Sequence, residues 1–261
     1  MITGVSYAGN PRDNTAMYIS KKVEYLVGNL VNVSGCKVFV ESTVEVPDEI
    51  RQKNEVVFTN TPQLDYARFV QQLDKERTDA ERKRKYTLTD GGYTVGENVK
   101  IGEGSYIEPG AFIGHDVVIG KNAYIKTGAK IRNAVIGDDF KAGDNCVIGE
   151  ADYLLTKDES GNNFIIPSFG KVVIGNNVEV GILSCVSCGQ AGDTVIGDNV
   201  HIHYLNCIPH DVRIGNNVKI AVGTIVGGYT EIGENAIIGF NSTIRNRISI
   251  GEGAFIGMGS V

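Results

Sequence analysis

The sequence contains no tryptophan, only three methionines and six prolines, and five cysteines among 261 residues. The cysteine count is odd and shows no spacing of a small disulfide-rich scaffold, so we expect free thiols in a reducing, cytoplasmic compartment. The chain also lacks an apolar run long enough to cross a bilayer and begins without a basic, apolar leader. We therefore expect neither a membrane segment nor secretion.

An excess of positive charge is missing as well. The chain has 25 Lys and Arg against 31 Asp and Glu, which gives a formal net charge of −6, and its pI is about 5.3. A nucleic-acid-binding domain normally presents a basic face. The composition therefore argues against nucleic acid as a partner, while the length allows one long domain and a smaller one.

Glycine, with 33 residues, is abundant and recurs in a pattern. From Val95 onwards an apolar marker residue, mostly isoleucine, stands at every sixth position, with a phase shift after Ile131 and interruptions after Ile148 and Val186. Glycine usually follows the marker. Three such units close a triangular coil, and stacked coils form a parallel β-helix. The markers predict about eight coils, with the marker side chains packed inside.

Residues 1–92 lack this repeat and mix strand and helix signals. Apolar runs at 37–41 and 55–59 predict strands. Thr61 followed by Pro62 predicts the start of a helix, with Thr61 as its N-cap. The charged stretch 74–85 predicts a solvated helix end and linker. We expect a small α/β domain over 1–92, mainly β structure overall, and the repeat domain over 93–261.

Two interruptions of the repeat and one histidine point to chemistry. Residues 151–170 and Cys188–Thr194 leave the regular pattern, and loops of this kind are commonly binding loops or lids. His210 lies two residues after a marker, at a predicted corner, and Gly228 stands one coil further on. An imidazole at a corner, with room left by a glycine, is a candidate general base.

Several segments of the chain resemble the hexapeptide acyltransferases, and among them the UDP-3-O-(3-hydroxyacyl)glucosamine N-acyltransferases of the lipid A pathway. These segments are Ile2-Thr-Gly-Val-Ser, Asn60-Thr-Pro, Ile166-Pro-Ser-Phe-Gly, Cys188-Gly-Gln-Ala-Gly-Asp-Thr and Ile208-Pro-His-Asp-Val. The resemblance covers nearly the whole chain. It implies a left-handed parallel β-helix and a homotrimer.

The resemblance also implies roles for particular residues. It assigns the catalytic general base to His210, and it places Gly228 where the family has a backbone amide close to the thioester. In that family the N-terminal domain holds the uracil base between aromatic side chains, and Tyr18 and Tyr25 fall near those positions.

The chain departs from the lipid A enzymes at several positions. His203 stands where those enzymes have the aspartate that orients the histidine, and Asp211 and Asp193 are alternative carboxylates. Arg247 replaces a second histidine, and the helical extension that receives acyl carrier protein does not follow the last repeat. These departures favour a related N-acyltransferase over the lipid A enzyme itself.

The resemblance thus implies acyl transfer from an acyl thioester to the amine of a nucleotide-linked amino or aminodideoxy sugar, for surface glycan synthesis. Acyl-CoA is favoured as co-substrate, and no permanently bound cofactor is expected. The alternative is the lipid A N-acyltransferase with a 3-hydroxyacyl carrier protein as donor. Substrate contacts are expected from Tyr18, Tyr25, His203, Asp193 and Arg247.

Two further readings are disfavoured. Cys185-x-x-Cys188 and Cys207-x-x-His210 have the spacing of a zinc site. Along a strand, however, three residues span about 10 Å, too far for one ion with bonds of about 2.1–2.3 Å. We therefore expect no metal, which argues against a zinc hydratase of the carbonic anhydrase type. A purely structural solenoid is disfavoured by the two loops and the N-terminal domain.

Overall fold

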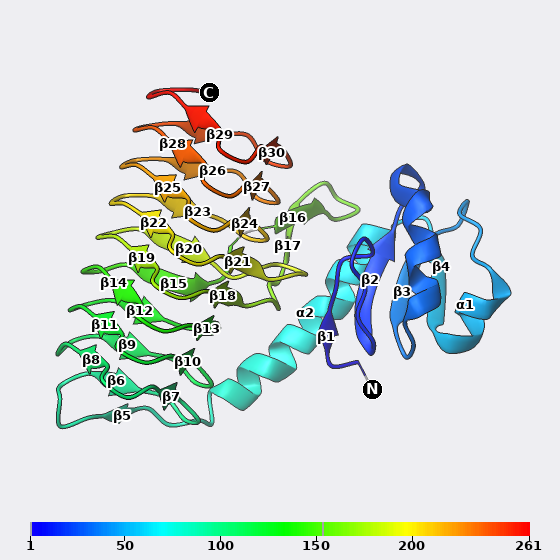
Figure 1. The fold of residues 1–261 in the computed structure, drawn as a ribbon. Coiled ribbons are helices and arrows are strands. Elements are labelled where there is room, and N and C mark those ends of the chain that lie inside the picture. The colour runs from blue at the N-terminus through cyan, green and yellow to red at the C-terminus, as the bar shows by residue number, and fades with distance from the viewer. Residues whose placement is uncertain (1, 153) are drawn as a thin grey trace. The chain divides into compact units, whose positions relative to one another are not determined.

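The computed structural model describes residues 2–152 and 154–261, and the chain folds into two compact units (Figure 1). The first unit comprises Met1–Lys83 and Tyr153–Phe169, and the second comprises Arg84–Asp152 and Gly170–Val261. The inserted segment therefore belongs to the first unit, although the chain enters it from the second.

The second unit is a left-handed parallel β-helix, which confirms the fold class expected from the repeat and the resemblance (Figure 1). Among the described residues its strands form three sheets of nine, eight and eight strands, so eight coils stack. Neighbouring coils pair in parallel, for example Cys185 with Cys207 and Val186 with Ile208. Side chains at the same place in successive coils therefore form columns.

Sheet I contains β5 (Thr87–Leu88), β6 (Thr94–Val95), β9 (Phe112–Ile113), β12 (Lys130–Ile131), β15 (Val147–Glu150), β20 (Cys185–Ser187), β23 (Cys207–Ile208), β26 (Ile225–Val226) and β29 (Thr243–Ile244). Sheet II contains β7 (Lys100–Ile101), β10 (Val118–Ile119), β13 (Ala134–Ile136), β18 (Val172–Ile174), β21 (Thr194–Ile196), β24 (Arg213–Ile214), β27 (Glu231–Ile232) and β30 (Ser249–Ile250). Sheet III contains β8 (Tyr106–Ile107), β11 (Tyr124–Ile125), β14 (Lys141–Ala142), β19 (Glu179–Val180), β22 (His201–Ile202), β25 (Lys219–Ile220), β28 (Ile237–Ile238) and β31 (Phe255–Ile256).

The interior and the corners of this prism follow from the repeat. Marker side chains such as Ile131 and Ile148 are fully buried and form one continuous core. At the corner between sheets II and III, asparagines adopt positive φ, which asparagine tolerates better than most residues. They also bond to one another, as from Asn199 Nδ2 to Asn217 Oδ1 at 3.3 Å. The corner residues therefore serve both the bend and the stacking.

The first unit contains a four-stranded parallel sheet in the order β1 (Gly4–Val5), β2 (Thr15–Ile19), β3 (Lys37–Glu41) and β4 (Glu55–Thr59). Its helices are the 3₁₀ helix η1 (Lys21–Asn32), α1 (Asp48–Lys53) and α2 (Pro62–Glu81). The strands predicted at 37–41 and 55–59 and the helix start at Pro62 are confirmed.

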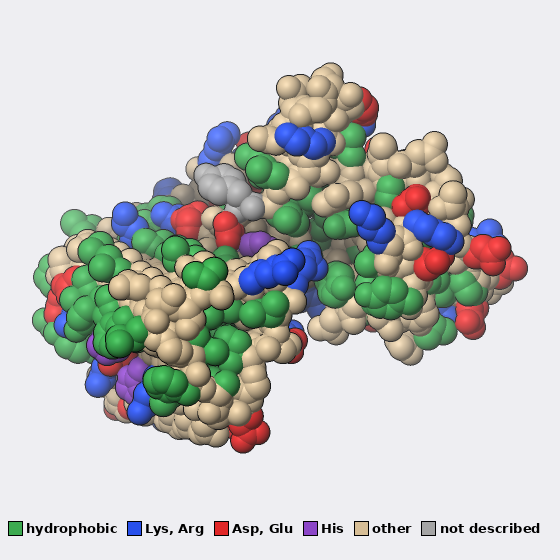
Figure 2. All heavy atoms as spheres, turned by 90° about the horizontal axis from the view of Figure 1, so that it is seen from above, with side chains coloured by type: hydrophobic (Ala, Val, Ile, Leu, Met, Phe, Trp, Pro, Cys, Tyr) green, Lys and Arg blue, Asp and Glu red, His purple; other side chains and the backbone are tan. Residues whose placement is uncertain are grey.

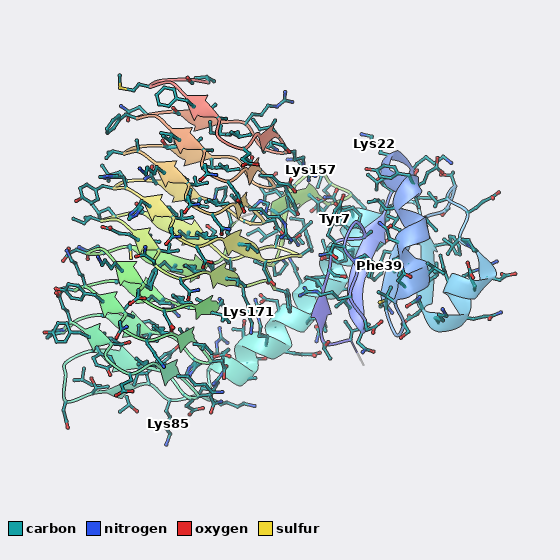
Figure 3. All side chains as sticks on the ribbon, viewed as in Figure 1. Tyr7, Lys22, Phe39, Lys85, Lys157 and Lys171 are labelled. Carbon is teal, nitrogen blue, oxygen red and sulfur yellow. The ribbon has the colours of Figure 1, made fainter. Side chains whose placement is uncertain are left out.

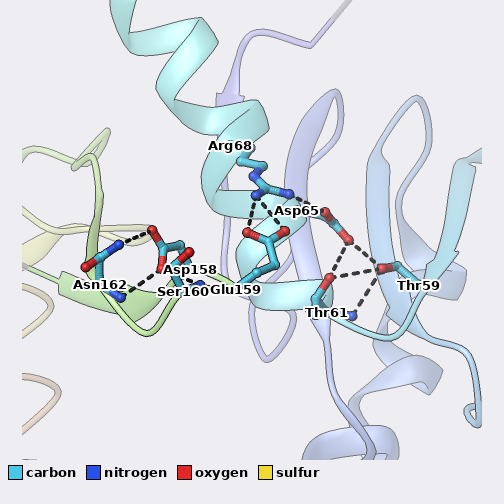
Figure 4. A network of polar contacts seen from close by, with 8 residues as sticks. All are labelled: Thr59, Thr61, Asp65, Arg68, Asp158, Glu159, Ser160 and Asn162. Carbon is cyan, nitrogen blue, oxygen red and sulfur yellow. Dashed lines mark hydrogen bonds and ion pairs between the residues drawn. The ribbon is translucent and has the colours of Figure 1, made fainter.

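Thr61 is the N-cap residue of α2, as predicted, but its side chain does not cap the helix. Thr61 precedes the helix but makes no capping bond to its backbone. Its hydroxyl donates instead to Asp65 Oδ2 at 3.0 Å, and Thr59 Oγ1 donates to the same oxygen (Figure 4). A hydrogen bond from the Thr61 hydroxyl to the charged Asp65 carboxylate is stronger than the bond that this hydroxyl would accept from a backbone N–H as a helix cap.

The inserted segment forms an antiparallel hairpin of β16 (Leu154–Lys157) and β17 (Asn163–Ile166), which packs against α2. Arg68 donates to both carboxylate oxygens of Glu159 at 2.6 Å (Figure 4). Gln71 Nε2 donates to the carbonyl of Ile165 at 2.9 Å. The expected loop is therefore an ordered hairpin, fixed within the first unit. None of the helices in the described residues has the length and hydropathy needed to span a membrane.

The stacked core predicts that alanine substitutions at two adjacent residues of one strand change the free energy of unfolding by very different amounts. Ile131→Ala should lower the free energy of unfolding by about 2–5 kcal/mol, because it opens a cavity in the prism. Lys130→Ala on the same strand faces solvent and should change it by at most about 0.5 kcal/mol. Denaturant titration followed by circular dichroism measures both. Equal losses for the two variants would contradict this account of the core.

Candidate active site

His210 lies at the corner where β23 of sheet I leads to β24 of sheet II. Its side chain is largely buried, at 9% exposure for the residue. Nδ1 lies 2.9 Å from Oδ2 of the next residue, Asp211. The corner thus holds a histidine and a carboxylate in direct contact. The sequence offered both Asp211 and Asp193 as partners of the histidine, and the carboxylate in contact with it is that of Asp211.

Asp211 is itself held by the second interruption of the repeat. Its carboxylate accepts hydrogen bonds from the backbone N–H groups of Gln190 (2.7 Å) and Gly192 (2.8 Å). Its own N–H donates to Thr194 Oγ1 at 3.0 Å. Burial raises the pKa of this carboxyl, but the bonds from His210, Gln190 and Gly192 outweigh burial and leave the pKa below its ordinary value.

The protonation of the pair follows from this environment. An ionised carboxylate has no proton to donate, so the hydrogen between His210 Nδ1 and Asp211 Oδ2 belongs to the imidazole. In neutral His210 the lone pair then lies on Nε2. Within residues 2–152 and 154–261 no group is hydrogen-bonded to that nitrogen. The arrangement presents a base that is oriented by a carboxylate.

Close backbone packing explains the glycines around Asp211. A Cβ on Gly170 would lie 1.7 Å from the carbonyl oxygen of Gly192, and one on Gly189 would lie 2.1 Å from the same oxygen. Gly170 N–H also donates to the Gly189 carbonyl at 2.9 Å. Larger residues would force the loop apart and remove the two amides that bind Asp211.

An internal comparison shows what is specific to His210. His115 and Asp116 repeat the same dipeptide at the same corner, lower in the prism. There, however, His115 Nδ1 accepts a bond from the N–H of Glu97 at 2.8 Å, and Asp116 is bound by Arg84 at 3.1 Å. His115 therefore caps a neighbouring coil, and its carboxylate neighbour does not orient it.

Gly228 lies beside His210, one coil further on. A Cβ on Gly228 would come within 2.9 Å of His210 Nε2, so only glycine leaves this position open. Its N–H has no hydrogen-bond partner in the described parts of the chain. In some other coils the corresponding N–H is capped by the next coil, as with Glu97 by His115 and Asp138 by Asn176. An uncapped backbone donor thus belongs to the residue that packs against the imidazole.

The structure does not bring the other predicted prism residues to His210. His203 lies at the corner between sheets III and I, where it lines a surface cavity of about 330 Å³ with Tyr204 and Phe240. Asp193 accepts a bond from the N–H of Lys171, which Figure 3 labels, at 2.8 Å. In one chain, therefore, neither residue touches the histidine.

Arg247 lies two coils beyond His210 at the same corner. Its guanidinium is 4.4 Å from the ring centroid of Tyr229, and that ring meets His210 edge-on at 5.1 Å. Sequence reasoning missed Tyr229. Its place in the column, one coil above Asp211, could have revealed it, because other coils carry aspartate or asparagine there.

The two tyrosines predicted for base binding lie in the first unit. Tyr18, on β2, packs against Tyr66 of α2 with ring centroids 5.2 Å apart. Tyr25, on η1, is 74% exposed. Only Tyr25 is open to a ligand on most of its surface.

The cysteines and histidines do not converge. No group of three or more His, Cys, Asp or Glu side chains in the described residues is placed to hold a metal ion. Cys185 and Cys207 are neighbours across paired strands of sheet I, whereas Cys188 is buried below the loop. Burial also raises the pKa of the Cys146 thiol to about 12, so this cysteine is inert at neutral pH.

Comparison with known proteins concerns the repeat that carries these residues. The family model for the bacterial transferase hexapeptide repeat matches residues 98–133 and 229–261. UDP-3-O-acylglucosamine N-acyltransferase 2 of Legionella pneumophila (strain Paris) is 34% identical over 84 residues, which is 32% of this chain and 24% of that protein. The chain thus carries the hexapeptide repeat of bacterial transferases, and the match spans about a quarter of the curated relative.

Solved structures show the same relation. The UDP-N-acetylglucosamine acyltransferase from Campylobacter jejuni superimposes with a TM-score of 0.55 and 27% identity, covering 64% of this chain and 63% of that one. The UDP-N-acetylglucosamine acyltransferase of Arabidopsis gives a TM-score of 0.58 and 26% identity, covering 65% and 59%. The resemblance to hexapeptide acyltransferases inferred from sequence is therefore confirmed, although each match spans less than two thirds of the neighbour.

The environment of Asp211 predicts a pH-dependent stability difference. Its pKa is lowered on folding, so the ionised carboxylate stabilises the fold above its unfolded pKa of about 3.9. This contribution is lost as the pH falls through the folded pKa. Asp211→Asn should therefore be less stable than the wild type by about 1.5–3 kcal/mol at pH 7. The difference should shrink towards pH 3, as urea titrations would show. A constant difference would contradict this ionisation.

Proposed function

We propose that the protein is an N-acyltransferase that moves an acyl group from an acyl thioester to the amine of a nucleotide-linked amino sugar. The observation that carries the proposal is the corner at His210, where a carboxylate-oriented imidazole lies beside the uncapped N–H of Gly228. The named relatives act on UDP-linked glucosamine derivatives, which supports the substrate class.

The reaction needs one base and no covalent intermediate. The amine nitrogen attacks the thioester carbonyl while His210 Nε2 accepts its proton, and Asp211 stabilises the imidazolium that forms. The C–S bond then breaks, and the proton passes from Nε2 to the leaving thiolate. Cys188 is buried and is not required as a nucleophile.

The tetrahedral intermediate carries a negative oxygen that needs a donor. The N–H of Gly228 fits this role because it is preorganised, adjacent to Nε2 and not used by the fold. Loss of one donor to such an oxyanion typically costs about 100- to 1000-fold in rate.

We assign binding of the other parts of the two substrates to the remaining predicted residues. We assign the nucleotide base to the first unit, with Tyr25 and Tyr18 as its aromatic contacts. Acyl-CoA is the preferred donor, and an acyl carrier protein the alternative. Large apolar side chains stay exposed over the repeat unit (Figure 2). The exposed large apolar residues include Leu205, Tyr204 and Phe240. Exposed apolar side chains of this size are typical of a surface that contacts another protein, which supports a homotrimer, in which His203 and Asp193 would face substrate.

Product mass spectrometry tests the proposal. The protein should convert UDP- or dTDP-linked amino sugars into N-acylated products with acetyl-CoA, 3-hydroxybutyryl-CoA or a long-chain 3-hydroxyacyl carrier protein. His210→Ala should reduce the rate about 100- to 10,000-fold, as expected for the loss of a general base.

His115→Ala is the matched control, because it removes the same dipeptide histidine from the same corner without touching the proposed site. It should leave the rate nearly unchanged. The active donor decides between a glycan enzyme and the lipid A alternative. Absence of product with every pair, or equal rates for wild type and His210→Ala, would refute the proposal.

Gly228→Ala tests the space beside the base. The new methyl group would lie 2.9 Å from His210 Nε2 and must displace either the imidazole or the backbone. We expect at least about a 100-fold fall in kcat, because a displaced imidazole no longer acts as the general base. Circular dichroism should show a retained fold. A variant with wild-type kcat would show that the open space beside Nε2 is not needed.

A further inference from the structure

Two bulky residues occupy strained backbone at the corner beyond His210. Tyr229 and Arg247 both have φ of +60°, a region that bulky side chains rarely adopt. At the same place in other coils stand Asn98, Asp116, Asn133 and Asp211. Strain of this kind is concentrated at functional sites, where it places a side chain for a task.

The pair forms an ordered cationic surface. Arg247 stacks over Tyr229 at 4.4 Å, an arrangement that orients a guanidinium while leaving its N–H donors at the edge. Tyr229 in turn meets the imidazole of His210 edge-on at 5.1 Å. The three side chains therefore form one continuous series of contacts from the base to the arginine.

Arg247 is not neutralised by the protein. Lower on the prism, Arg132 pairs with Glu150 at 3.4 Å and Arg84 with Asp116. No carboxylate pairs with Arg247 in the described residues. Asp211 is the only acid in the corner segments 209–211, 227–229 and 245–247, and its charge is already bound by three donors. The Arg247 guanidinium at this corner is therefore available to bind an anion, although the chain as a whole carries a net charge of −6.

We propose that Arg247, held by Tyr229, binds a phosphate of the acceptor substrate, the diphosphate of the nucleotide-linked sugar. This inference rests on the proposed function. Arginine matches phosphate with paired N–H groups. Successive coils lie about 4.8 Å apart, so Arg247 is displaced about 10 Å from His210 along the prism.

That spacing favours the acceptor over the donor as the source of the phosphate. In a nucleotide-linked sugar a single ring separates the reacting amine from the diphosphate. In coenzyme A the much longer pantetheine arm separates the thioester from its phosphates. With the amine at His210 Nε2, the diphosphate therefore falls near Arg247, and between these two residues the glycines Gly227 and Gly228 leave the Tyr229 ring as the side chain that contacts both.

Calorimetric binding of UDP, dTDP, inorganic pyrophosphate and coenzyme A to the whole protein tests the inference. Arg247→Ala should weaken binding of UDP or dTDP, and of pyrophosphate, by about 10- to 100-fold, the loss expected for charge-assisted hydrogen bonds. Arg247→Lys should recover part of the affinity, since it keeps the charge but not the paired donors. Tyr229→Leu should weaken binding, whereas Tyr229→Phe should not, because it keeps the ring.

Arg213→Ala is the matched control, since Arg213 is an exposed arginine on the strand that follows His210 but lies outside the column. It should leave all affinities unchanged. The inference is overturned if the wild type binds neither nucleotide nor pyrophosphate, if Arg247→Ala binds them as the wild type does, if the loss is confined to coenzyme A, or if Arg213→Ala loses as much.

Binding does not require turnover, so the two proposals can fail separately. A protein that binds UDP through Arg247 but forms no N-acylated sugar would refute the proposed reaction and leave this site standing. An active enzyme whose KM for the nucleotide sugar is unchanged in Arg247→Ala would refute the site and leave the reaction standing.

Discussion

The stacking of coils in register is the constraint on which the rest of this structure depends. Each coil hydrogen-bonds to the next through parallel strands, so a residue's neighbours in space are set by its place in the coil. Asp211, Tyr229 and Arg247 become one column although the sequence separates them. A site in such a protein is therefore assembled along the prism axis, and one substitution alters one level of it.

Most of the prism could be predicted because the residues that determine it recur at a regular spacing in the sequence. The spacing of markers such as Ile131 and Ile148 specified strands, corners and core together, and the prism follows them. The position of His210 at a corner was predictable for the same reason. The period could not predict the conformation of the loop Cys188–Thr194, whose backbone N–H groups bind the carboxylate of Asp211. Asp211 and Asp193 were equivalent in sequence, and only the folded loop separates them.

Residues outside the repeat were harder to place. The inserted segment carried a signal for a loop but none for its destination, which depends on pairs such as Arg68 with Glu159, far apart in the chain. Tyr229 stands where other coils carry aspartate or asparagine, a departure that the sequence displays, but its contact with His210 exists only in the folded chain. The same limit applies to Thr61, whose hydroxyl had a competitor in Asp65 that the capping pattern ignores.

The chain leaves the prism after Asp152 to complete the first unit and returns at Gly170. Neither unit is thus a continuous stretch of sequence. Recombination that exchanged only the N-terminal residues for those of another protein would leave the hairpin of the old unit behind, without the helix on which it packs. The two units are therefore expected to be inherited together and to diversify by point substitution, even though each has its own core.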